Sequence, residues 1–197
     1  MNFHLSSKKL FVVASISVAL SLSACTSNNT ANPASSMSAP MTNGGMTDKE
    51  TSLSAADVMF LQMMIPHHEQ TVEMSMLAIS NTENEDVLSL AARIEAAQQP
   101  EIELMQKWLT DAGQPLTADH GMGDSGMMTL NDMSALESAK DNDFDELYLT
   151  GMINHHNGAI DMARSVASSA NADVSTLANN IIKSQTDEIA EMTALLK

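Results

Sequence analysis

An internal repeat constrains this chain more than any other feature of its sequence. Residues 64–68 (MIPHH) recur 88 positions later as residues 152–156 (MINHH), and residues 86–105 recur at an offset of 87 as residues 173–192. In each half, apolar residues follow the three- and four-residue spacing of a helix with one buried face. Because a helical hairpin cannot bury such a face alone, two copies are expected to pack together. The repeat therefore predicts an all-α fold, a four-helix bundle made of two duplicated helical hairpins.

Composition and capping residues agree with this fold class. The chain has 17 Met but only four Phe, one Tyr and one Trp, which favours helices over an aromatic-rich sheet. Gly113 is expected to end the second long helix, and a short helix over about residues 131–140 is expected to connect the hairpins. Residues suited to the N-cap position place the four long helices, namely Ser54, Asn84 or Asp86, Asn142, and Asp173.

The first 25 residues resemble an export signal. Two lysines precede a mostly apolar run over residues 10–22, which is shorter than a membrane span of about 20 residues. Leu22-Ser23-Ala24-Cys25 resembles the bacterial lipobox, in which the cysteine becomes the acylated first residue of the mature protein. Thr26 then favours the outer membrane if the cell is Gram-negative. The alternative is an ordinary cleaved signal that leaves Cys25 as a free thiol.

The mature chain is expected to comprise a tether and one domain. Residues 26–52 are rich in Thr, Ser, Asn, Ala, Pro and Gly and lack apolar periodicity, which predicts a flexible tether that contains methionine. Residues 53–197 are expected to form the bundle. Removal of the signal leaves 7 basic and 25 acidic residues, a net charge of −18. This charge disfavours nucleic acid and anionic lipid headgroups as partners and is compatible with gathering cations.

The two HisHis pairs are the first candidate binding site. Residues three, four and seven positions apart share one face of a helix, so each histidine lies near methionines of its own helix. Imidazole and thioether groups together suit copper as it cycles between Cu(II) and Cu(I). The candidate ligands in these two helices are His67, His68, His155, His156, Met63, Met64, Met74, Met152 and Met162.

The other long helices and the glycine-rich connection carry further candidates. The second and fourth helices each present Gln, Glu and Met along one face, which could complete sites begun by the histidines. The connection has no helix to stabilise, yet it contains one His and three Met, which suit capture of Cu(I) or Ag(I). Cys25 is the single cysteine, which excludes a Cys-based metal site. The further candidates are Glu101, Met105, Glu188, Met192, His120, Met122, Met127 and Met128.

A purely structural interpretation of these residues stays open. A histidine on an apolar face is usually a hydrogen-bonded core residue, and methionine at helical spacing usually fills gaps in a core. Gln and Glu at the inner edge of a helix can bond across to a neighbouring helix. Duplication of a structural hairpin would repeat the HisHis pair together with its flanking methionines.

The motifs also resemble a known bacterial family. Residues 60–70, Gln98–Ile102, His120-Gly121-Met122 and residues 152–159 are similar to the signature of the family catalogued as domain of unknown function 305. The resemblance covers about residues 54–197. It implies a ferritin-like four-helix bundle, and the family includes CopM-type periplasmic copper-binding proteins. For this chain it implies that both HisHis pairs and nearby methionines are copper ligands.

Three functions are therefore compatible with the sequence. The leading hypothesis is a non-enzymatic, lipid-anchored periplasmic protein that binds copper or silver for buffering, tolerance, or transfer to copper-trafficking proteins. The second is a ferritin-like dimetal oxidase, which the ligand types disfavour, because such sites use Glu-x-x-His and the residues three before His67 and His155 are methionines. The third is an envelope docking module without a metal.

Overall fold

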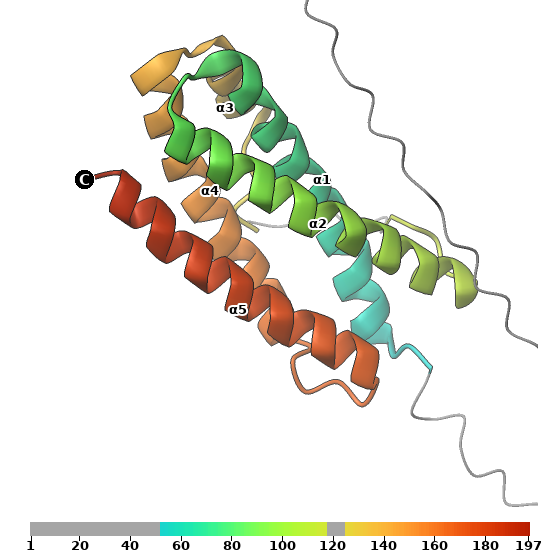
Figure 1. Ribbon diagram of the computed structural model, residues 1–197. Helices are drawn as coiled ribbons and strands as arrows, with labels where there is room; N and C mark the ends of the chain where they lie inside the picture. Colours follow the sequence, from blue (N-terminus) through green and yellow to red (C-terminus); the bar gives the residue numbers. More distant parts are fainter. Residues whose placement is uncertain (1–51, 118–124) are drawn as a thin grey trace, which may run out of the picture. The chain divides into compact units, whose positions relative to one another are not determined.

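Four long helices and one short helix make up the described part of the chain. The computed structural model describes residues 52–117 and 125–197, and within these ranges the chain forms no β-strand. In chain order the helices are α1 (Ala55–Asn81), α2 (Glu85–Asp111), α3 (Leu130–Ser138), α4 (Asp141–Arg164) and α5 (Ala172–Leu195) (Figure 1). The predicted signal with Cys25, residues 26–51 of the predicted tether, and both His120 and Met122 lie outside the described residues.

The long helices pair as two hairpins. α1 packs along α2, α4 packs along α5, and the hairpins meet where α1 packs against α4 (Figure 1). The short α3 packs against both α1 and α4. The predicted all-α bundle of two helical hairpins with a short connecting helix is thus confirmed. None of the helices in the described ranges is both long and apolar enough to cross a membrane.

Local sequence accounts for the ends of the first hairpin. Ser54 caps α1 in a capping box: its hydroxyl accepts from the amide of Asp57 at 3.1 Å, and the Asp57 carboxylate accepts from the Ser54 amide at 2.8 Å. Asn84 caps α2 through its side-chain oxygen. Gly113 follows α2 with a φ of 66°, a conformation that suits glycine. These three boundaries are as the sequence predicts.

The starts of the second hairpin differ from the prediction. Asn142 is not a cap, because α4 begins at Asp141 after Lys140, which makes no side-chain cap. Tertiary contacts hold this junction instead: Lys140 Nζ donates to Asn81 Oδ1 at 2.8 Å, and the Asn81 amide donates to three carbonyls at the end of α3 and just beyond it. At α5 the cap is Asn171 rather than Asp173, and its side-chain oxygen accepts two amide hydrogens of the first turn.

The core consists of two apolar clusters separated along the bundle axis. Along α1 the first cluster ends at Ile65 and the second begins at Met74, and a similar interruption occurs on α2, α4 and α5. Polar side chains from all four long helices fill the interval. This polar layer comprises His67, His68, Thr71, Gln98, Glu101, His155, His156, Gln185 and Glu188. A buried polar layer across a small bundle is costly unless its groups are partnered, so its contacts bear directly on function.

Candidate metal centre

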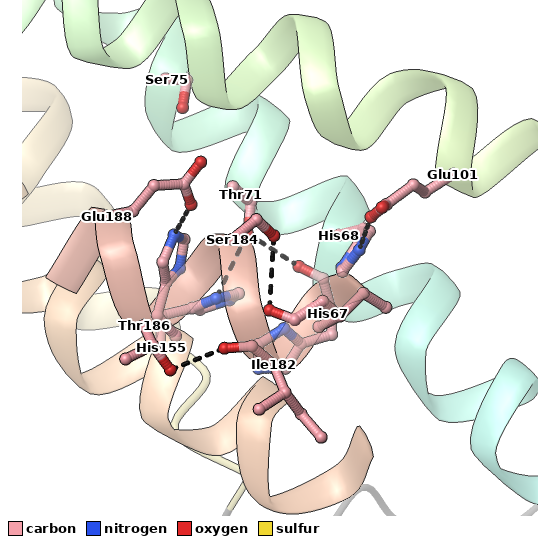
Figure 2. Close-up of polar contacts among 12 residues, drawn as sticks. His67, His68, Thr71, Ser75, Glu101, His155, Ile182, Ser184, Thr186 and Glu188 are labelled. Carbon is pink, nitrogen blue, oxygen red and sulfur yellow. Dashed lines mark hydrogen bonds and ion pairs between the residues drawn. The ribbon is translucent and has the colours of Figure 1, made fainter. Parts of the chain in front are cut away.

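Four buried histidines occupy the middle of the polar layer. His67 of α1 and His155 of α4 meet where the two hairpins pack, with ring centroids 3.7 Å apart and planes tilted by 44°. Adjacent residues on a helix point about 100° apart, so the second histidine of each pair turns towards its own hairpin partner. Figure 2 shows His68 directed to Glu101 of α2 and His67 beside His155. All four imidazoles have 0 % exposure.

Carboxylates hold the outer histidine of each pair. His68 Nε2 lies 2.9 Å from Glu101 Oε2, and His156 Nε2 lies 2.8 Å from Glu188 Oε2. A carboxylate accepts hydrogen bonds, so in both contacts the imidazole donates from Nε2. The two glutamates are partly exposed while the histidines are fully buried. Each glutamate therefore orients an imidazole from the edge of the bundle, as carboxylates do behind metal-binding histidines.

Hydrogen bonds fix where the hydrogens lie on His67 and His155, which we call the stacked pair because of their short centroid distance. His67 Nε2 lies 3.0 Å from the carbonyl oxygen of Ser125, which can only accept. His155 Nε2 lies 3.1 Å from Gln70 Oε1. The Gln70 amide cannot be reversed, because its oxygen accepts from the Met128 amide at 2.8 Å and its nitrogen donates to the Met128 carbonyl at 3.0 Å. His155 must then donate as well, so all four histidines carry their hydrogen on Nε2.

A neutral imidazole with its hydrogen on Nε2 offers the lone pair of Nδ1. Within the described residues, the Nδ1 atoms of His67, His68 and His156 are buried without a hydrogen-bond partner, and His155 Nδ1 lies 3.3 Å from the Thr71 hydroxyl. Both amide atoms of Gln98 and Oε1 of Gln185 are also buried without a partner there. Buried polar atoms in native proteins are almost always satisfied. This concentration of orphaned nitrogen and oxygen atoms fits a centre that takes up a cation.

Burial keeps the stacked imidazoles neutral. It lowers the pKa of His67 from 6.5 to about 3, with repulsion from His68 and His156 adding to the effect and the bond to Ser125 opposing it. Burial also holds the pKa of His155 well below 6.5, together with repulsion from the other three histidines. Metals bind the neutral form of imidazole. Because His67 and His155 are neutral at neutral pH, a metal ion need not displace a proton from their Nδ1 atoms.

The same pKa shifts predict an acid-sensitive metal-free protein. The unfolded chain takes up protons at His67 and His155 below about pH 6.5, whereas the folded chain resists them, so stability falls as the pH drops from about 6.5 towards 3. The limiting slope is about 1.4 kcal/mol per pH unit for each histidine. Urea unfolding of metal-free protein at pH values from about 7.5 to 4.5 measures the loss. A double variant without these two histidines should lose less stability over the same pH range. If the stabilities of the variant and the wild type fall in parallel, carboxylates and not these histidines cause the loss.

The predicted methionine ligands divide between two kinds of environment. Five are fully buried in the apolar clusters that flank the histidines: Met64, Met105, Met74, Met152 and Met192. The other four described ones are partly buried, namely Met63, Met127, Met128 and Met162. Among residues 52–117 and 125–197, no three side chains of His, Cys, Asp or Glu gather as a metal cage. Glu101 and Glu188 face the Nε2–H groups of the histidines. The groups available to bind a metal are therefore imidazole nitrogens with neighbouring thioether or amide groups.

The sequence analysis missed two contributors to the centre. Gln70 lies three residues after His67, so helical spacing alone would have placed it beside the histidines. The Ser125 group that meets His67 is a backbone carbonyl, which no pattern of side chains identifies.

Comparison with known proteins finds both a matching family model and similar solved structures. The model of the family described as Domain of unknown function (DUF305) matches residues 57–196. A DUF305 protein from Streptomyces coelicolor is similar in structure, with a TM-score of 0.69 and 32 % identity over 72 % of this chain and 90 % of the other. A DUF305 fragment from Deinococcus radiodurans has a TM-score of 0.69 and 26 % identity over 74 % of this chain and 97 % of the other.

Structures of a protein named CopM are also similar. The Cu(I)-bound form has a TM-score of 0.61 and 29 % identity over 71 % of this chain and 94 % of CopM. CopM has also been solved in Cu(II)-bound, silver-bound and apo forms. A search of curated proteins yields no match. Because the family model spans most of the described helices, this chain belongs to the DUF305 family.

Proposed function

We propose that this protein binds copper, and silver in the same way, through the buried histidines of its polar layer. The observation that carries the proposal is the set of three buried imidazole Nδ1 atoms, of His67, His68 and His156, that have no hydrogen-bond partner in the part of the chain that the structure describes. A purely structural histidine would have both ring nitrogens satisfied. The similarity to CopM, solved with Cu(I), Cu(II) and silver, supports the same class of cargo for this chain.

The donor types favour soft metal ions. Neutral imidazole binds both oxidation states of copper, and thioether sulfur adds a preference for Cu(I) and Ag(I). His67, His68, His155 and His156 would supply the nitrogen donors, and the methionines of the flanking turns would supply sulfur. The net charge of −16 of the full chain raises the local concentration of cations around the bundle. It does not by itself select copper.

The biological role follows from the expected location. We propose that acylated Cys25 anchors the protein in the bacterial envelope, where the bundle buffers copper or transfers it to trafficking partners without catalysing a reaction. Thioethers suit this role because, unlike thiols, they form no disulfides in an oxidising compartment. The predicted tether would let the bundle reach partners away from the membrane surface.

A metal titration tests the proposal. The mature chain from residue 26, prepared without its lipid, is titrated with Cu(I) under anaerobic, reducing conditions against a chromophoric Cu(I) chelator, and the series is repeated with Ag(I), Zn(II) and Fe(II). We expect Cu(I) and Ag(I) to bind at a fixed stoichiometry in the presence of excess Mg²⁺. Failure to compete with the chelator would favour a docking module, and tight Fe(II) binding with oxygen consumption would favour a dimetal oxidase.

A further inference from the structure

A short non-helical segment crosses α4 beside the histidines. This strap, residues 125–128, lies so close to α4 that backbone meets backbone at two glycines. A Cβ atom added to Gly158 would lie 1.7 Å from the Ser125 carbonyl oxygen, and one added to Gly126 would lie 2.5 Å from the Asn154 carbonyl oxygen. Gly126 also has a φ of 78°, which side-chain-bearing residues rarely adopt. These two glycines are thus required for the strap to dock.

The docked strap holds both stacked imidazoles. It accepts the Nε2 hydrogen of His67 directly through the Ser125 carbonyl at 3.0 Å. It holds His155 through Gln70, whose amide bonds both the amide and the carbonyl of Met128 while its oxygen accepts the Nε2 hydrogen of His155 at 3.1 Å. One element that lies outside the four long helices therefore sets the ring orientation and the tautomer of both histidines.

We propose that Gln70 and the strap are positioning groups for metal binding. They keep His67 and His155 as Nε2–H tautomers, so that both rings offer Nδ1 as the donor atom. This inference rests on the proposed copper-binding function. When the strap is undocked, each ring regains rotation about its side chain and either nitrogen can carry the hydrogen, so binding must first restore the order that the strap supplies.

Two glycines of α4 provide a matched pair of variants. Gly158→Ala places a methyl group against the strap backbone, which cannot move aside without undocking. Gly151→Ala makes the same chemical change on the same helix, but its Cβ would meet side chains instead of backbone: Met128 Sδ and Cε at 3.1 and 3.3 Å and Met74 Cε at 3.6 Å, whose flexible ends can shift. Both substitutions raise helix propensity equally, so neither is expected to unfold α4. Gln70→Leu is a third variant, which removes the amide and leaves both glycines unchanged.

The experiment has two readouts on the mature chain. The first is Cu(I) affinity measured by chelator competition. The second is the tautomer of each imidazole in the metal-free protein, read from long-range ¹⁵N–¹H correlation spectra. Loss of an orienting contact behind a metal-binding histidine weakens binding about 10- to 100-fold. We expect that loss, together with loss of the Nε2–H signature at His67 and His155, in Gly158→Ala, and the same change at His155 in Gln70→Leu. Gly151→Ala should keep the Nε2–H signatures of both histidines, because its methyl group meets side-chain atoms of Met128 and Met74 and leaves the strap backbone docked.

The outcomes separate this inference from the function on which it rests. Wild-type affinity and unchanged tautomers in Gly158→Ala would overturn the positioning role, and so would equal losses of the Nε2–H signatures in the two glycine variants. If the wild type binds no Cu(I), the proposed function fails, while the spectra of metal-free protein still decide whether the strap sets the tautomers.

Discussion

Replacing both stacked histidines by leucine, His67→Leu with His155→Leu, is expected to lower Cu(I) affinity at least about 100-fold and to leave the metal-free protein folded. Loss of an orienting contact alone costs about 10- to 100-fold, and loss of two donors costs more. Stability should fall by no more than about 1 to 2 kcal/mol. The hydrogen bonds of His67 to Ser125 and of His155 to Gln70 and Thr71 are lost, but an orphaned nitrogen is removed and apolar side chains are buried. Gln70 keeps both contacts with Met128.

Chelator competition and urea unfolding, run on the same preparations, check this prediction. Phe60→Leu with Phe144→Leu is the control, because it removes one buried ring from each apolar cluster and leaves the polar layer unchanged. The control should be less stable by several kcal/mol and should keep its Cu(I) affinity. A histidine variant that unfolds readily yet retains affinity would assign the histidines to structure and place copper elsewhere in the chain.

Replacing the two orienting carboxylates, Glu101→Ala with Glu188→Ala, is expected to weaken Cu(I) binding by about 10- to 100-fold for each carboxylate lost. The carboxylates bond the Nε2 atoms of His68 and His156, so their removal frees these rings to turn and to place the hydrogen on either nitrogen. It also withdraws a negative charge from behind each imidazole, which makes the ring a weaker donor. The affinity falls although the four histidines are all present.

Charge alone could mimic this result, and a neighbouring residue separates the two causes. Glu103 lies on α2 two residues from Glu101 but is exposed, so Glu103→Ala changes the net charge without touching a histidine. Its effect on affinity should be small and should vanish in about 0.5 M salt, because exposed charges are screened. Equal losses in Glu101→Ala and Glu103→Ala would reduce the role of Glu101 to general attraction of cations.

The repeat predicts the fold because each half must bury its apolar face on the other. The capping residues of the first hairpin are predictable too, since local bonds make those caps. The start of α4 is not, because contacts from Asn81 and Lys140 replace a local cap there. Prediction of this boundary would require knowing which distant side chain reaches the junction.

The candidate site can be predicted only in part from the sequence. Helical geometry predicts that the members of each HisHis pair diverge, and spacing brings Glu101 and Glu188 to the right faces. Which nitrogen is free depends on a backbone carbonyl, which no residue type encodes, and on the amide of Gln70. Spacing places Gln70 near the histidines but does not show that a distant backbone segment fixes its amide. Periodicity likewise gives the same pattern for a methionine that fills the core and for one that binds a metal.

Each of the two apolar clusters contains residues from all four long helices, and this governs how the chain acquires its structure. A single hairpin holds only half of each cluster, so neither hairpin can form a closed interior while the other is missing. The second cluster includes Met192, near the end of α5. Closure of both clusters, and with it the meeting of the histidines, therefore requires α5 to have been made.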